Sequence, residues 1–442
     1  MAKTDNLHDF LKDLANTIRT KKGSSAPINP QNFSFEISTI DTSGGSGSLP
    51  MLAERNDVNF LDYDGVILTS YTKDEFLALS NMPILPSQPG LICQGWNYTL
   101  EEAQSFVSEY GVLDVGAMYM TNDGKTRLYI RIAEKGRMIV PLYIYQSVAN
   151  GVVINWGDGS AEQTLSGSGW VNTTHTYSNK GNYVITLDVA NGCSLGLGNE
   201  NSTYNVLGPN TRGDIVYSSM LQKVEIGNNV PEIKACSFAN SYSLKSITIP
   251  NGVTFIGANS FLSCYSLISI IIPNSVTTLK GFAASCYALK SVVIPKSVTS
   301  VLGSPFYACY ALGSIVIPNS LTSVGSNAFY NCYTLASAVL PKSITSIDNS
   351  IFYNCYSLAS IVIPSNVTKI GSYAFYFCYG VKFYDFRALT SIPILDSTNA
   401  FSNISSDCKI VVPDGLFDQW KAASNWSSYA SYIVKASNYN PK

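Results

Sequence analysis

The chain has 442 residues, of which 46% are hydrophobic and only 13% are charged, and its formal net charge is −2. This length allows about two to four domains with substantial cores, and the scarcity of charge means that Ser, Asn, Thr, Gly and Tyr form most of the surface. Because a nucleic-acid interface needs a stripe of Lys and Arg and no such cluster stands out, nucleic acid is excluded as a partner.

Residues 1–42 are predicted to be a helical attachment segment. Their apolar residues follow the spacing of an amphipathic helix, and Asn29-Pro30 begins a second short helix. Two such helices are too small to form a core, and residues 43–49 form a Gly/Ser linker, so we expect attachment to another protein. The alternative, that the helices pack on the next domain, stays open. The apolar stripe of the attachment helix consists of Leu7, Phe10, Leu11, Leu14 and Ile18.

The same N-terminal segment alternates charged with apolar residues and lacks the apolar core of a signal peptide. No part of the chain approaches the roughly 18 consecutive apolar residues of a transmembrane helix. We therefore expect no signal peptide and no membrane insertion.

Residues 50–137 are predicted to form a small α+β domain. Residues 66–68 and 128–130 are predicted strands. Residues 99–110 are a predicted helix, with Thr99 as N-cap and Glu102 completing a capping box. Asn122-Asp123-Gly124 lies between two apolar runs and predicts a β-hairpin. Nothing in this domain has the pattern of a catalytic site.

Residues 138–200 are predicted to form a small β-sandwich, because alternating apolar strands are separated by Gly and Asp turns. Trp-Gly-Asp-Gly-Ser at 156–160, His-Thr-Tyr at 175–177 and the strand at 181–187 resemble a polycystic-kidney-disease (PKD) type immunoglobulin-like module. The resemblance implies a spacer or adhesion unit. Asp158 and His175 allow an acid–base pair, but the better interpretation is that Asp158 caps a tight turn and His175 is structural.

Residues 201–385 are predicted to be a solenoid of about seven 23-residue repeats, beginning near Leu221. Each unit has one short strand and cannot bury its apolar face alone, so the units must stack. Their cysteines are predicted to form a buried, reduced ladder, because identical side chains point the same way and are poorly placed for disulfides. A zinc site lacks ligands, since only two histidines exist. Two markers keep the period, namely prolines at 250, 273, 295, 318, 341 and 364 and cysteines at 264, 286, 309, 332, 355 and 378.

The unit at residues 361–379, with Pro364, Val-x-x-Ile-Gly and Ala-Phe-x-x-Cys-Tyr, resembles the BspA-type leucine-rich repeat family. The resemblance covers about residues 221–385 and implies a right-handed solenoid used for adhesion, without catalysis. No cofactor or metal is expected. Residues 386–442 are predicted to cap the last coil, which otherwise exposes a strand edge. The expected fold is thus mainly β, with a helical N-terminus, an α+β domain, a PKD/Ig-like sandwich and a C-terminal solenoid.

Both ends of the chain resemble segments of phage proteins. Residues 7–40, with Lys-Lys-Gly and Pro-Ile-Asn-Pro-Gln, resemble the N-terminal segment of phage tail and virion proteins, and residues 411–434 resemble the closing cap of phage repeat proteins. These resemblances imply a virion protein that is assembled in the host cytoplasm. The leading function is a tail-tip or fibre adhesin, and the alternatives are a capsid or tail decoration protein and a bacterial cell-surface adhesin.

The expected partners are other virion proteins through the N-terminal helices and a bacterial surface glycan or protein through the repeats. A homo-oligomer is also expected, with a trimer as one candidate.

Two periodic surfaces of the repeats are candidates for binding. Tyrosines suit glycans and proteins, but they also suit a packing ladder in which each ring covers the next. Outward β-branched residues on the strands form an apolar stripe that either contacts another subunit or domain or reflects strand propensity alone. The tyrosine rows are Tyr265, Tyr287, Tyr310, Tyr333, Tyr356 and Tyr379, and Tyr307, Tyr330, Tyr353 and Tyr376. The apolar stripe is Ile271, Val293, Val316, Val339 and Val362.

Overall fold

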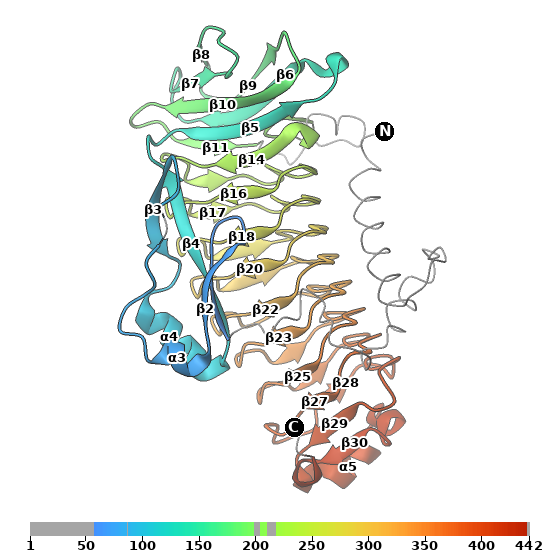
Figure 1. The fold of residues 1–442 in the computed structure, drawn as a ribbon. Coiled ribbons are helices and arrows are strands. Elements are labelled where there is room, and N and C mark those ends of the chain that lie inside the picture. Colours follow the sequence, from blue (N-terminus) through green and yellow to red (C-terminus); the bar gives the residue numbers. More distant parts are fainter. Residues whose placement is uncertain (1–56, 86, 199–203, 210–217, 440–442) are drawn as a thin grey trace, which may run out of the picture. The chain divides into compact units, whose positions relative to one another are not determined.

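A computed structural model describes residues 57–439 except 86, 199–203 and 210–217. The predicted attachment segment 1–42, with its helix, and the linker 43–49 lie outside the described residues. The described chain is mainly β (Figure 1), and no helix in it is long and apolar enough to cross a bilayer.

Residues 57–121 form a four-stranded sheet with two helices, which we call the α+β module. The strand order is β2-β1-β4-β3, with β1 and β4 parallel. The predicted capping box of the longer helix is confirmed, because Thr99 and Glu102 each accept a hydrogen bond from the other's backbone amide. The elements are β1 (Val58–Leu61), β2 (Ile67–Tyr71), α3 (Lys73–Leu77), β3 (Leu91–Trp96), α4 (Leu100–Tyr110) and β4 (Leu113–Thr121).

The hairpin predicted at Asn122-Asp123-Gly124 is wrong, although the turn itself is present. Gly124 adopts a φ of 72°, and its amide donates to the carbonyl of Thr121. The strand that follows, β5 (Thr126–Ile132), pairs with β10 and β14 instead of β4. The turn therefore leads the chain from the α+β module into a second sheet. Which sheet β5 joins is decided by β10 and β14, which lie far from it in the sequence.

The next part of the chain consists of two facing sheets (Figure 1). One has the order β16-β14-β5-β10-β7-β8 and the other β17-β15-β11-β6-β9. Trp156 is buried between them, where its carbonyl accepts a hydrogen bond from the Tyr177 hydroxyl at 2.8 Å. The elements are η2 (Lys135–Arg137), β6 (Ile139–Gln146), β7 (Val152–Asn155), β8 (Gln163–Thr164), β9 (Gly169–Thr176), β10 (Gly181–Val189), β11 (Leu195–Leu197), β12 (Tyr204–Asn205) and β13 (Gly208–Pro209).

These sheets continue directly into the repeats. Strand β14 (Leu221–Glu225) pairs antiparallel with β5, and β15 (Glu232–Ile233) pairs parallel with β11. One hydrophobic core therefore runs from Leu128 to Ile433 without interruption. The sequence-based limits at 137/138 and 200/201 fall inside this continuous core, because β5 belongs to the two-sheet region. The pairing covers the strand edge that the first coil would otherwise expose.

Each coil of the solenoid contributes to two rows of short parallel strands, joined by a side made of turns. The first strand row comprises β16 (Ser246–Thr248), β18 (Ser269–Ile271), β20 (Ser291–Val293), β22 (Ser314–Val316), β23 (Ser337–Val339), β25 (Ser360–Val362) and β27 (Phe383–Asp385). The second comprises β17 (Phe255–Ile256), β19 (Thr278–Lys280), β21 (Ser300–Leu302), β24 (Ser346–Ile347), β26 (Lys369–Ile370) and β28 (Ile394–Leu395).

The turn side carries the cysteine ladder inside the core. All ten cysteines of the chain are free, and the six of the ladder have no exposed surface. Each of these six thiols donates to a backbone carbonyl of the preceding coil, for example Cys332 to Phe306 at 3.3 Å and Cys355 to Phe329 at 3.2 Å. The ladder thus fills the core and also ties adjacent coils together.

The C-terminal segment covers the last coil. Trp420 and Trp426 are buried, and their rings contact Phe386 at centroid distances of 5.4 and 5.5 Å. These rings replace the next coil that the core would otherwise require. The elements are β29 (Lys409–Val412), η4 (Asp414–Leu416), α5 (Phe417–Ala422), η5 (Trp426–Tyr429), β30 (Ile433–Lys435) and η6 (Ala436–Asn438).

Candidate binding surfaces

The α+β module covers the outward face of the first strand row over β18 and β20. Ile271 and Val293 join the core of the module and are 6% and 3% exposed. Gly116 of β4 lies so close to Ile271 that an added Cβ would be 2.6 Å from Ile271 Cγ2. Burying these β-branched side chains removes apolar area from water and stabilises the contact.

Polar contacts hold the same interface. The Tyr98 hydroxyl donates to the Ile294 carbonyl at 2.9 Å, and Ser269 Oγ donates to the Tyr63 carbonyl at 3.0 Å. Lys296 forms an ion pair with Glu102 of α4. Burial raises the pKa of Tyr98, so its hydroxyl stays protonated and remains a donor at neutral pH.

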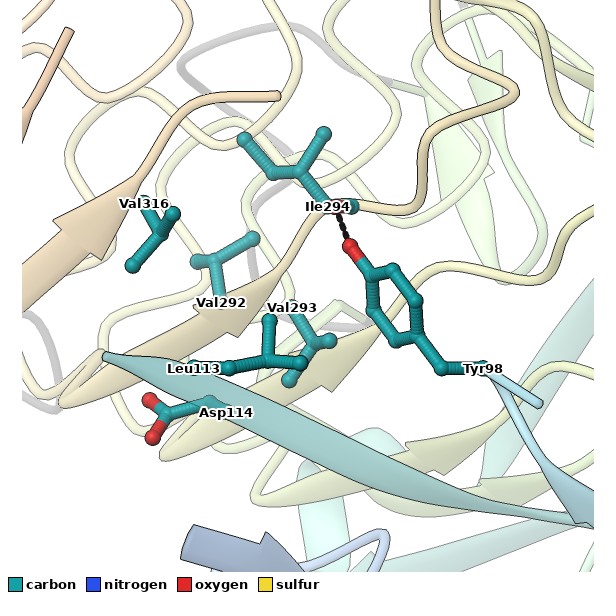
Figure 2. Close-up of a pocket in the computed structure, with 7 residues that line it drawn as sticks. All are labelled: Tyr98, Leu113, Asp114, Val292, Val293, Ile294 and Val316. Atoms are coloured by element: carbon teal, nitrogen blue, oxygen red, sulfur yellow. Dashed lines mark hydrogen bonds between the residues drawn. The ribbon is translucent and has the colours of Figure 1, made fainter. Parts of the chain in front are cut away.

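The module ends at β22, where a small pocket opens (Figure 2). Tyr98, Leu113 and Asp114 line one side of this pocket, and the other side consists of Val292, Val293, Ile294 and Val316. Figure 2 shows the Tyr98 ring extending across to the Ile294 carbonyl, to which its hydroxyl donates.

The predicted apolar stripe is therefore divided by the module. Its first two residues are buried, Val316 and Val339 are half-buried, and Val362 is 61% exposed. Sequence reasoning identified the stripe but not the residues that cover it, which include Tyr63, Tyr98 and Gly116. A glycine inside a strand signals close approach of another chain segment, and Gly116 is such a residue.

The first tyrosine row is a stack that begins one coil earlier than expected, at Tyr242. Ring centroids from Tyr242 to Tyr356 are 4.3–5.1 Å apart with interplanar angles of 5–22°, and the last step to Tyr379 is 6.1 Å. Apart from Tyr242, which is buried, these residues are half-buried. Each inner ring has both faces covered by its neighbours, and hydroxyls of successive rings such as Tyr287 and Tyr310 hydrogen-bond each other. A ligand would therefore meet the ring edges and a connected line of hydroxyl groups.

The second row, from Tyr307 to Tyr376, stacks in the same way, with centroids 4.4–4.9 Å apart. The two rows lie close enough to interact electrostatically. Burial raises the pKa of Tyr310, and the neighbouring Tyr307 raises it further. Burial, and then the neighbouring Tyr330 and Tyr376, raises the pKa of Tyr353 to about 12, so the hydroxyls remain neutral donors and acceptors at neutral pH.

We call the eight tyrosines that form both rows over four successive coils the tyrosine surface. Because the ring faces are occupied, this surface does not offer a flat platform for stacking a sugar ring. It offers two parallel lines of hydroxyl groups set on aromatic edges. Its members are Tyr307, Tyr310, Tyr330, Tyr333, Tyr353, Tyr356, Tyr376 and Tyr379.

Asp158 and His175 lie together in the two-sheet region. Asp158 accepts a hydrogen bond from the Ser160 amide at 3.0 Å, as predicted for a turn cap, and its other oxygen lies 2.7 Å from His175 Nε2. Hydrogen bonds from Ser160, and then the contact with His175, lower the pKa of Asp158 to about 2. The His175 ring stacks on Trp156 with a centroid distance of 4.8 Å, which fixes it as part of the packing.

Successive coils form two rows of parallel strands and bury a repeated set of Leu, Ile, Val, Phe and Cys. These features define a leucine-rich repeat solenoid. Its type follows from comparison with protein families. Residues 214–336 and 280–409 match the BspA type leucine rich repeat region, in 6 copies. The match covers the solenoid, and a leucine-rich repeat solenoid is typically a non-enzymatic binding scaffold.

Solved leucine-rich repeat proteins are similar to parts of the chain. One from T. pallidum is 27% identical over 36% of this chain and 74% of its own length, with a TM-score of 0.32. One from Bacteroides ovatus is 24% identical over 42% of this chain and 60% of its own length, with a TM-score of 0.34. One from Eubacterium ventriosum is 29% identical over 38% of this chain and 43% of its own length, with a TM-score of 0.31. The chain thus spans less than two thirds of the last two. Comparison with curated proteins gives no match.

Proposed function

We propose that this protein is an adhesin of a phage particle, at the tail tip or fibre, that recognises a bacterial surface through its repeat region. The tyrosine surface carries the proposal. It presents two lines of neutral hydroxyls over four coils, as a polar ligand that extends along the solenoid would require.

Assignment to a phage is supported by the resemblance of the two ends of the chain to phage virion proteins. We further propose that residues 1–42 attach the chain to other virion proteins and that the chain is a homo-oligomer, with a trimer as one candidate. Comparing the solution mass of the full chain with that of a chain lacking residues 1–48 tests this arrangement. A trimer that becomes a monomer on truncation supports it, whereas monomers in both cases count against it.

Binding to bacteria tests the adhesin proposal. The fluorescently labelled full chain is mixed with cells of candidate host species, and the bound fraction is measured after sedimentation. Replacing Tyr307, Tyr330, Tyr353 and Tyr376 by Phe removes one line of hydroxyls and keeps the stacked rings. Because a hydrogen bond contributes about 0.5–1.5 kcal/mol, we expect affinity to fall about tenfold or more.

The matched control replaces Tyr145 and Tyr432 by Phe, since both are half-buried tyrosines outside the two rows. This variant should bind as the unaltered chain does. Equal binding by all three proteins, with unchanged melting temperatures, would show that the tyrosine surface does not bind the cell.

A further inference from the structure

The repeat region carries a positive charge that the composition of the whole chain conceals. Residues 233–384 contain eight lysines and one aspartate, Asp348, with no arginine or glutamate, which gives a net charge of +7. The whole chain has a formal net charge of −2. The repeat region is therefore positively charged, although the whole chain carries a small negative net charge.

Three of these lysines lie on one edge of the solenoid. Lys245, Lys290 and Lys382 are exposed, and each directly precedes a strand of the first row. We call these three residues the lysine row. Each follows a stacked tyrosine by three residues, as Lys290 follows Tyr287.

Backbone hydrogen bonds show that this edge is continuous from coil to coil. The amide of Gly313 donates to the carbonyl of Lys290 at 3.2 Å, and the amide of Lys382 donates to the carbonyl of Ala359 at 2.8 Å. Coils stack about 4.8 Å apart, so Lys290 and Lys382, four coils apart, are separated by roughly 19 Å. The equivalent positions between them are Gly313, Ala336 and Ala359. These residues carry at most a methyl group, so no bulky side chain stands between the two lysines on this edge.

Three other lysines of the region form ion pairs, whereas the described residues show none for the lysine row. Lys296 pairs with Glu102, Lys369 with Asp396 at 3.0 Å, and Lys234 with Glu232. Within the described part of the chain, Lys290 and Lys382 make no ion pair with a carboxylate. Their charge remains available to a ligand.

We propose that this edge binds a linear polymer that carries a phosphate in each repeat unit. The inference rests on the proposed adhesin function and names the chemistry of its ligand. Unpaired lysines spaced two and four coils apart along one edge suit a long linear polyanion, and lysine binds phosphate as a point charge. Residues 233–384 contain no arginine, so a contact with this region is made through the point charge of lysine and not through the planar fork of arginine. Tyrosine hydroxyls beside the row supply neutral donors.

The test measures binding of the full chain to inorganic polyphosphate by titration calorimetry at several salt concentrations. Polygalacturonate is the carboxylate probe and dextran the uncharged one. Replacing Lys290 and Lys382 by Gln should weaken polyphosphate binding about tenfold or more, because two cations that neutralise its phosphates are removed. The salt dependence should also become shallower, because fewer counterions are released.

The control variant replaces Lys135 and Lys180 by Gln, which removes the same charge from exposed sites in the two-sheet region. It should bind polyphosphate within about twofold of the unaltered chain, since the contact is local. Absence of polyphosphate binding, a preference for polygalacturonate, or an equal loss in both variants overturns the inference. If cells still bind the chain in any of those cases, the adhesin function stands and only the phosphate ligand is rejected.

Discussion

Replacing Gly116 by Ala tests whether the α+β module is packed on the solenoid as described. The added Cβ would lie 2.6 Å from Ile271 Cγ2, 2.7 Å from Cγ1 and 2.9 Å from Cδ1, all well inside van der Waals contact. Overpacking of this kind costs about 1–3 kcal/mol of unfolding free energy. Replacing Ile271 by Ala removes all three atoms, and because the side chain is 6% exposed it should cost about 2–5 kcal/mol alone.

The two changes should compensate each other, because the new methyl group enters space that the isoleucine has left. We expect the double variant to be more stable than the sum of the single effects by about 1 kcal/mol or more. Denaturant unfolding gives the four free energies of the cycle, and hydrogen exchange of the β1 and β4 amides reports opening of the module. The control is Gly313→Ala, which has no atom within 4 Å of an added Cβ. Additive effects within about 0.5 kcal/mol would refute the contact.

Three further predictions concern the thiols, a strained turn and the response to acid. A thiol reagent should modify one cysteine of the native protein, the exposed Cys93, and all ten after denaturation, because burial raises the pKa of ladder thiols such as Cys332; fast modification of several native thiols would contradict this. Gly303→Ala should cost about 1–2 kcal/mol in thermal unfolding, since Gly303 has a φ of 70°, whereas Gly313→Ala should change little; equal effects would exclude backbone strain as the cause. Asp158→Asn should cost about 0.5–1 kcal/mol at neutral pH, because solvent screens this partly exposed carboxylate. Since the pKa of Asp158 is lowered to about 2, the wild-type advantage is present above about pH 4 and disappears as the pH falls to about 2; an advantage that persists at pH 2 would contradict the assignment.

The repeats were predictable because their contacts are local. Residues such as Ile361, Phe375 and Cys378 meet their counterparts one coil away, so a period read from the sequence places them correctly in the core. The capping box at Thr99 was predictable for the same reason, since both of its hydrogen bonds join residues three apart. The hydrogen bonds of the cysteine ladder were not anticipated, because their acceptors are backbone carbonyls of the preceding coil.

The sequence by itself thus determined the solenoid, the buried cysteines and the positions of the tyrosine rows, because these depend on neighbouring coils. Only the tertiary structure decided which part of the apolar stripe is covered, since Gly116 and Ile271 are distant in the chain and meet through packing of a separate sheet. It also decided that the hairpin signal at 122–124 joins two different sheets. The period also gives Lys290 and Lys382 equivalent positions, since four repeats separate them, but only the tertiary structure shows that both are exposed and make no ion pair within the described residues.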